Sequence, residues 1–391
     1  MFIPPKIIEL LNKGIVIPDP YNVYIGDEVD TGRISGNGVI IYPGCKIYGS
    51  SVLILEKVKI GHEGPVTLEN CQVGSEVNLK GGFLKEAVFL KGANLGSGSH
   101  VREGTILEEE AGIAHTVGLK QTILFPYVTL GSLINFCDCF MSGGTGRKDH
   151  SEVGSSYIHF NYTPGQDKAT PSLLGDVPNG VMLKQRPIFL GGQGGLVGPC
   201  RLAFGTTVAA GTICRKDELR SGRLIFGDPS RSGNIPYTPG DNRNIKKILT
   251  NNIVYISNLT ALMHWYSYVR YQFISADFPE ALLDGLKKRL DSAVSERITR
   301  FKEFVEKNGG TNTATGRWPE FENCFISDAG MEEIIPLRDS FLEIIASGIR
   351  KSGKDYLTVI KNLKDEESNI GTQWLQGIVD AKTSEAMKVL I

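Results

Sequence analysis

Arg102 and Lys120 are two cationic residues whose spacing could build an anion site. They lie eighteen residues apart, and each directly follows an aliphatic residue. A guanidinium offers an oxyanion a two-pronged hydrogen bond, and an ammonium offers it a point charge. If the fold stacks the two cations, an anion between them relieves their repulsion, and phosphate is the natural candidate. The other interpretation is that both cations are solvated or paired with Glu103 or with residues 108–110.

A second set of polar side chains lies between Asn161 and Lys168, in the segment NYTPGQDK. The Asn161 amide and the Tyr162 phenol provide neutral hydrogen bonds that suit sugar hydroxyls or an acetamido group, and Lys168 adds a cation. A Pro-Gly turn shapes the loop. By itself the motif also fits an ordinary surface turn, so its meaning depends on the elements that position it.

A six-residue repeat predicts those elements. Between residues 95 and 123 an aliphatic residue recurs at every sixth position, and a small or medium residue follows four positions after each one. This period fits neither an amphipathic helix nor an alternating strand, and a short fixed repeat predicts a solenoid of parallel strands. A similar repeat returns between residues 190 and 212. After Leu119 the repeat resumes early at Leu124, which predicts that one residue drops out of the coil.

These segments resemble the hexapeptide-repeat transferases, and the resemblance implies a left-handed parallel β-helix with a triangular cross-section. If each side of the triangle takes one six-residue unit, residues eighteen apart lie above one another on adjacent coils, roughly 4.8 Å apart. Arg102 and Lys120 would then point outward from the same face as a stacked pair.

Composition limits the partners of the chain. It has 391 residues, with 42 Lys plus Arg against 43 Asp plus Glu, so its summed charge gives no reason to expect nucleic acid or an anionic membrane as partner. No apolar run approaches the roughly 20 residues that span a bilayer, and no leader-like segment opens the chain, so we expect a cytoplasmic protein. Seven scattered cysteines argue against a disulfide framework.

The periodicity changes along the chain and predicts an all-β solenoid followed by an α-helical domain. The expected segments are an N-terminal helix and cap at 1–22, the β-helix at 23–226, a Pro/Gly/Ser-rich linker at 227–242 and the α-helical domain at 243–391. Two polar loops, 141–150 and 163–186, are expected to leave the coil. In the helical domain, apolar stripes predict a helix from Ile245, a long helix that starts near Pro279 and ends at Gly309–Gly310, and further helices around 331–349 and 372–390.

Residues 101–217 also resemble a particular family, the C-terminal acetyltransferase domain of bacterial N-acetylglucosamine-1-phosphate uridyltransferase, or UDP-N-acetylglucosamine pyrophosphorylase. Arg102 falls where this family has a sugar-phosphate-binding arginine in Leu-Arg-Pro-Gly. Lys120 matches the lysine of its Val-Glu-x-Lys-Lys motif. Asn161, Tyr162 and Lys168 match its Asn-Tyr-Asp-Gly-x-x-Lys motif, with one residue inserted here.

The same resemblance implies a cofactor and an assembly. Gly192 and Ala210 stand where the family contacts acetyl-coenzyme A. The implied reaction is acyl transfer from acetyl-CoA or another acyl-CoA to an amino-sugar phosphate, with a phosphorylated sugar or a UDP-N-acetylglucosamine-like UDP-sugar as the bound partner. The implied assembly is a homotrimer, and no metal is required.

One departure from the family concerns the catalytic base. The family's histidine in Gly-His-Leu-x-Tyr is replaced here by Ser132. A serine hydroxyl cannot act as a base near neutral pH unless another group activates it. His115, about one coil below, and His159, in the strand of the sugar motif, are candidates for the missing base, and Ser132 itself is the third catalytic candidate. Both histidines also fit structural or substrate-contacting roles.

Two functions therefore stay open. One is the acyl-CoA-dependent transferase, which the Ala209–Gly211 segment favours. The other is a catalytically inactive sugar-nucleotide-binding, scaffold or regulatory protein related to the same family, whose helical domain recruits a protein partner; Ser132 favours this alternative. A zinc-dependent carbonic anhydrase of the same fold needs two histidines five residues apart, and the sequence has no such pair.

Overall fold

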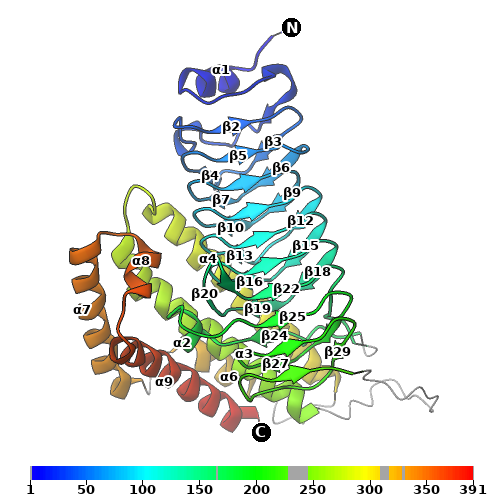
Figure 1. The fold of residues 1–391 in the computed structure, drawn as a ribbon, viewed down its shortest axis with the longest axis vertical. Helices are drawn as coiled ribbons and strands as arrows, with labels where there is room; N and C mark the ends of the chain where they lie inside the picture. Colours follow the sequence, from blue (N-terminus) through cyan, green and yellow to red (C-terminus); the bar gives the residue numbers. More distant parts are fainter. Residues whose placement is uncertain (1, 164–165, 228–244, 309–316, 328–330, 391) are drawn as a thin grey trace, which may run out of the picture.

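The computed structural model describes residues 2–163, 166–227, 245–308, 317–327 and 331–390. Residues 24–225 form a left-handed parallel β-helix, and helices pack along one side of its second half (Figure 1). This confirms the predicted fold class. Of the predicted linker at 227–242, only Gly227 belongs to the described residues.

Three parallel sheets form the sides of the solenoid, and we call them sheets A, B and C. Sheet A contains β2 (Ile40–Ile41), β5 (Lys59–Ile60), β8 (Asn78–Leu79), β11 (Asn94–Leu95), β14 (Gly112–Ile113), β17 (Thr129–Leu130), β22 (Glu152–Val153), β25 (Phe189–Leu190), β28 (Thr207–Val208) and β30 (Leu224–Ile225). Sheet B contains β1 (Tyr24–Ile25), β3 (Lys46–Tyr48), β6 (Val66–Glu69), β9 (Gly82–Lys85), β12 (Ser99–Val101), β15 (Val117–Lys120), β18 (Ile134–Cys137), β23 (Ile158–Phe160), β26 (Gly195–Val197) and β29 (Ile213–Cys214). Sheet C contains β4 (Leu53–Ile54), β7 (Gln72–Val73), β10 (Ala87–Phe89), β13 (Thr105–Leu107), β16 (Ile123–Leu124), β19 (Cys139–Met141), β24 (Ser172–Leu174) and β27 (Arg201–Leu202).

The aliphatic residues of the repeat form the core of the solenoid. Val101, Leu107 and Ile113, one on each sheet, are at most 2% exposed. Because side chains alternate along a strand, the residue after each aliphatic position points outward. The repeat therefore determines which side chains line the interior and which lie on the outer faces.

The pairing register confirms the predicted loss of one residue. Val101 pairs with Leu119, eighteen residues on, whereas Leu107 pairs with Leu124, seventeen residues on. The shortened corner contains Gln121, whose φ is +51°. The coils before and after this corner stay in register, because the inward aliphatic residues still pair with one another across it.

The two predicted loops have different outcomes. The first contains a small antiparallel hairpin outside the coil, β20 (Gly144–Gly146) with β21 (Asp149–His150). The prediction that 163–186 is one continuous excursion is wrong, because β24 returns to sheet C within it and only then does the chain leave again through α2 (Val177–Gly180). Leu173 and Leu174 in β24 are at most 4% exposed. The surrounding prolines obscured this short core strand.

The N-terminal end of the solenoid is covered by α1 (Pro5–Asn12), followed by the 3-10 turns η1 (Pro20–Asn22) and η2 (Thr31–Arg33). Ile7 and Leu10 of α1 are fully buried and belong to the same core as the coils. The helix thus covers apolar side chains that the first coil would otherwise expose to water.

The helical domain contains α3 (Ile245–His264), a π-helical turn η3 (Trp265–Val269), η4 (Arg270–Phe273), α4 (Glu280–Lys307), α6 (Trp318–Ile326), η5 (Glu332–Ile334), α7 (Ile335–Ser352), α8 (Tyr356–Lys361) and α9 (Asp365–Leu390). The predicted long helix is α4, with Pro279 as its N-cap. Its predicted end at Gly309–Gly310 lies outside the described residues. The sequence did not predict α6 or α8. None of the described helices is long and apolar enough to cross a bilayer.

The helical domain packs against sheet C. Helix α4 contacts β7, β10 and β13, and α3 contacts β24. Leu286 and Leu290 of α4 share one hydrophobic core with Phe89 of β10. The solenoid and the helices therefore bury a continuous apolar interface.

Candidate functional site

The corner between sheets A and B carries a ladder of backbone hydrogen bonds. The carbonyls of His115, Ser132, Ser155 and Gly192 each accept a hydrogen bond from an amide one coil further along. The donors are Leu133, Ser156, Gln193 and Gly211, all with φ between +54° and +72°. This repeated turn places equivalent residues of successive coils about 4.8 Å apart. We call this edge the A–B corner; it contains His115 and Ser132, the catalytic candidates, and Gly192 and Ala210, the predicted cofactor positions.

Two of the catalytic candidates are in direct contact on the A–B corner. Ser132 Oγ lies 2.8 Å from His115 Nδ1, and the Ser132 amide donates to Ser155 Oγ at 3.1 Å. His115 is exposed and Ser132 is half-buried, so a ligand on the outer surface can reach both. If Nδ1 carries the proton, its N–H donates a hydrogen bond to Ser132 Oγ, and Nε2 keeps a lone pair and can act as a base.

His159, the third catalytic candidate, lies inside the solenoid. It is 2% exposed, its Nδ1 donates to the Cys137 carbonyl at 2.7 Å, and its Nε2 lies 2.8 Å from Ser172 Oγ. Burial lowers its pKa to about 4, so the ring is neutral near pH 7. The structure does not bring His159 together with His115 and Ser132.

Arg102 and Lys120 occupy the outer face of sheet B, at the end next to sheet C. The pairing of Val101 with Leu119 puts the two cations in register on adjacent coils, and the Arg102 amide donates to the Leu119 carbonyl. Arg102 is exposed, whereas Lys120 Nζ lies 2.7 Å from Glu103 Oε1. Lys120 is therefore paired with Glu103, which is the alternative to an anion site that the sequence left open. A phosphate can replace Glu103 in this contact.

The loop that contains Asn161, Tyr162 and Lys168 begins beside this pair. Asn161 Nδ2 donates to Asp138 Oδ2 at 2.6 Å, and Tyr162 is 57% exposed. Lys168 is exposed, and its backbone carbonyl accepts from Arg297 Nη1 at 3.4 Å. Residues 164–165, the predicted Pro-Gly turn, lie outside the described residues.

A buried ion pair connects this loop to the helical domain. Arg297 Nη2 of α4 lies 2.8 Å from Asp138 Oδ1, and the two side chains are 2% and 5% exposed. Asp138 thus holds Arg297 with one oxygen and Asn161 with the other. Sequence reasoning missed both residues, because no local pattern indicates which arginine of a helix will reach a distant corner.

The A–B corner and the cation pair flank one short stretch of sheet B. Strand β15 has four residues and spans about 10 Å. Between the two edges, Gly118 has no side chain and pairs with His100 below and Asn135 above. An extended ligand can therefore lie across this face, with an anionic group at Arg102 and a reacting group near His115.

Metal chemistry has no obvious site in the part of the chain that the structure describes. Within those residues, no group of three or more His, Cys, Asp or Glu side chains is arranged to hold a metal ion.

Comparisons with known proteins identify relatives of about half the chain. No family model matches it. The "Bifunctional protein GlmU" of Thermotoga maritima is 28% identical over 213 residues, which are 54% of this chain and 42% of that protein. The protein of the same name from Pelobacter propionicus is 27% identical over 214 residues, 54% of this chain and 40% of that protein. The chain therefore spans less than half the length of these curated relatives.

These relatives confirm the resemblance seen in the sequence. A solved structure, the UDP-N-acetylglucosamine acyltransferase from Campylobacter jejuni, is 12% identical and matches 70% of this chain and 93% of that chain. Its TM-score of 0.22 is too low to support an argument.

Proposed function

Since the solenoid is a GlmU-like hexapeptide-repeat domain, we propose that this chain binds a phosphorylated sugar or UDP-sugar and transfers an acyl group to its amino group from acyl-CoA. The observation that carries the proposal is the 2.8 Å contact between Ser132 and His115 on the A–B corner. It supplies an imidazole beside the position where the resemblance expects one.

The proposed reaction needs one proton acceptor. The neutral substrate amine attacks the thioester carbonyl carbon, and a C–N bond forms as the carbonyl becomes tetrahedral. His115 Nε2 takes a proton from the amine nitrogen, the C–S bond breaks, and the CoA thiolate leaves and is protonated. Ser132 accepts the Nδ1–H hydrogen bond and so holds the imidazole in the tautomer that leaves Nε2 unprotonated.

We assign the groups that bind the phosphate, the sugar and the acyl-CoA by their positions around sheet B. Arg102 and Lys120 bind the phosphate, which replaces Glu103 as the ion-pair partner of Lys120. Tyr162 and Lys168 contact the sugar from the loop. The acyl-CoA lies along the A–B corner at Gly192 and Ala210, where small residues allow close approach to the backbone.

We also propose that the active form is a homotrimer. Apolar side chains with at least 39% exposure lie on sheets A and B and on the corner between them, as expected of a surface that another subunit covers. They are Leu133, Ile158, Phe160 and Phe189.

The test combines ligand binding with turnover. Purified protein is incubated with glucosamine 1-phosphate and acetyl-CoA, and free CoA thiol is measured. Replacing a general base costs about 10²–10⁴-fold in rate, so His115→Asn is expected to lose at least about 10²-fold. His62→Asn is the matched control, because His62 is an exposed histidine that follows β5 on the same corner of a distant coil. Equal rates for the two variants would refute the role of His115.

The second candidate function is a catalytically inactive sugar-nucleotide sensor or scaffold, which Ser132 in the base position favours. A ligand that binds only the folded state raises the unfolding midpoint. For the transferase, both UDP-N-acetylglucosamine and acetyl-CoA are expected to raise it, and Arg102→Ala to remove the sugar-nucleotide effect. A response to the sugar nucleotide alone, without CoA release, would favour the sensor.

A further inference from the structure

A third cation, Lys85, lies in line with the phosphate-binding pair of the proposed site. Lys85, Arg102 and Lys120 each directly follow one of three core residues that pair in register on successive coils of sheet B. Because neighbouring coils are about 4.8 Å apart, the three positions span about 10 Å along the solenoid. We call these three residues the cation ladder.

The carboxylates that pair with the cation ladder lie at the surface. Lys85 Nζ lies 2.9 Å from Glu69 Oε1, and the glutamate side chain is 31% exposed. Lys120 Nζ lies 2.7 Å from Glu103 Oε1, and this side chain is 35% exposed. Arg102 lies between the two pairs and is exposed. Since exposed ion pairs contribute little to stability, an oxyanion can displace both glutamates into the solvent at low cost.

The length of the cation ladder limits the class of anion. Glu86, the residue after Lys85, already pairs with Arg289 Nη1 at 3.1 Å, so Lys85 remains available to a ligand. With Glu69 and Glu103 displaced, the ladder presents three positive charges on one line. A single phosphate group can bridge two neighbouring cations, but it cannot contact three that span about 10 Å, whereas two linked phosphates can.

An aromatic pair lies beside the cation ladder on the same coils. Phe83 and His100 pair in register, two residues before the first two members of the ladder, so their side chains leave sheet B on the same outer face. Their ring centroids lie 5.3 Å apart, with the ring planes 39° apart. The corresponding residues on the flanking coils are small: Thr67 beside Phe83 and Gly118 beside His100. Both ends of the ring pair therefore have room for a ligand.

We infer that the acceptor of the proposed transferase is a nucleoside diphosphate sugar and not a sugar monophosphate. The diphosphate lies along the cation ladder, and the base stacks on the Phe83 end of the ring pair, beside Lys85. The sugar lies over Gly118, with its amino group towards His115. The place of the sugar rests on the proposed function, whereas the nucleotide site rests on the ladder and the ring pair.

The first experiment compares the binding of uridine 5′-diphosphate and uridine 5′-monophosphate to the full chain by calorimetry. The diphosphate is expected to bind at least about tenfold more tightly, because only the diphosphate reaches all three cations. Lys85→Met is expected to reduce this preference to less than about threefold. Lys59→Met, at an exposed lysine on sheet A, is the matched control and is expected to leave it unchanged. Equal affinities for the two nucleotides, or an unchanged preference in Lys85→Met, would overturn the inference.

Inorganic pyrophosphate separates the contribution of the base from that of the phosphates. Phe83→Leu keeps an apolar side chain but removes the ring, and it is expected to weaken the binding of uridine 5′-diphosphate at least about fivefold. The same substitution is expected to change pyrophosphate binding less than about twofold, because pyrophosphate has no base. Equal losses for the two ligands would contradict the base site.

A turnover measurement distinguishes this inference from the proposed function. With acetyl-CoA as donor, kcat/KM is expected to be at least about tenfold higher for UDP-glucosamine than for glucosamine 1-phosphate. A preference for glucosamine 1-phosphate would overturn the inference and keep the transferase. Binding of uridine 5′-diphosphate that depends on Lys85, without acetylation of either acceptor, would support the nucleotide site and reject the transferase.

Discussion

Replacing Arg297 with methionine tests whether the helical domain holds the substrate loop. The Asp138–Arg297 pair is almost fully buried, with side chains 5% and 2% exposed. Removing one partner of a buried pair leaves the other charge unpaired and costs about 3–5 kcal/mol. Because Asn161 still donates to Asp138, we expect a value near the lower end, about 3 kcal/mol.

The chain offers a direct assay and a matched control for this prediction. All three tryptophans, Trp265, Trp318 and Trp374, are buried in the helical domain, so fluorescence during urea unfolding reports that domain. With a slope of about 3 kcal/mol/M, a 3 kcal/mol loss lowers the midpoint by about 1 M. Arg300→Met is the control, because Arg300 pairs on the surface of the same helix with Glu296 and Glu303 and is expected to lose less than about 1 kcal/mol.

A second substitution separates unpaired charge from lost packing. Asp138→Asn in the Arg297→Met background removes the unpaired carboxylate and is expected to recover part of the lost stability. Hydrogen exchange in residues 161–168 is expected to rise in Arg297→Met and to stay unchanged in Arg300→Met. Equal urea midpoints for Arg297→Met and Arg300→Met would refute the reasoning.

Three further predictions concern stability and reactivity. Burial and the neighbouring Glu109 carboxylate raise the pKa of Glu108 to about 8. Between about pH 4.5 and about pH 8 the folded state therefore keeps a proton that the unfolded state has released, and the urea midpoint is expected to fall as the pH rises through this range. Glu108→Gln is expected to flatten this fall. Leu10→Ala in α1 is expected to cost about 2–5 kcal/mol and to promote aggregation through the uncovered end of the solenoid, measured by thermal melting with light scattering. Burial raises the pKa of Cys71 to about 12, so iodoacetamide is expected to label it only after unfolding, as mass spectrometry can show.

The sequence predicts the solenoid well because every coil repeats the same packing problem. The inward aliphatic residue at each sixth position directly reports burial, and even the missing residue before Leu124 is visible as a shift of that pattern. The same regularity predicts that Arg102 and Lys120 lie in register. It places His115 about one coil below Ser132, although only the structure gives their 2.8 Å contact.

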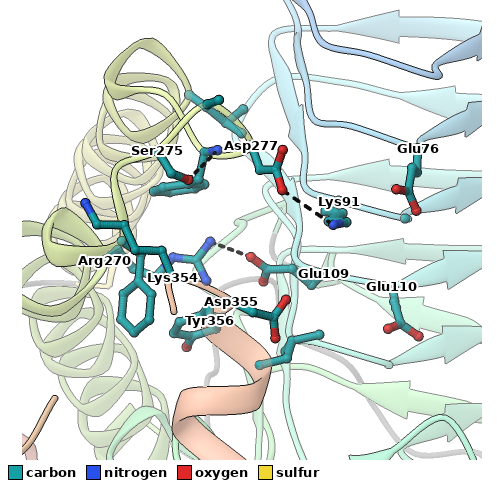
Figure 2. Close-up of a pocket in the computed structure, with 16 residues that line it drawn as sticks. Glu76, Lys91, Glu109, Glu110, Arg270, Ser275, Asp277, Lys354, Asp355 and Tyr356 are labelled. Atoms are coloured by element: carbon teal, nitrogen blue, oxygen red, sulfur yellow. Dashed lines mark hydrogen bonds and ion pairs between the residues drawn. The ribbon is translucent and has the colours of Figure 1, made fainter. Parts of the chain in front are cut away.

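No periodic sequence pattern predicts the contacts between the solenoid and the helical domain. Arg297 reaches Asp138 across 159 positions of sequence, and the pair forms only because α4 docks on sheet C. Arg270 of the helical domain pairs with Glu109 of the solenoid for the same reason (Figure 2). The sequence also misses α6 and α8, since helices of nine and six residues contain too few turns to establish a periodic stripe.

Helix α4 has a consequence for how the solenoid can change in length. Arg289 binds Glu86, and Arg297 binds Asp138. The eight residues from Arg289 to Arg297 rise about 12 Å along the helix, and the three coil steps from Glu86 to Asp138 span about 14 Å. The length of the helix therefore matches the spacing of the two solenoid corners that it binds. Repeat proteins commonly gain or lose whole units, but a coil added between Glu86 and Asp138 would move one arginine away from its partner. Variation in coil number is therefore expected towards the N-terminal end, beyond the reach of α4.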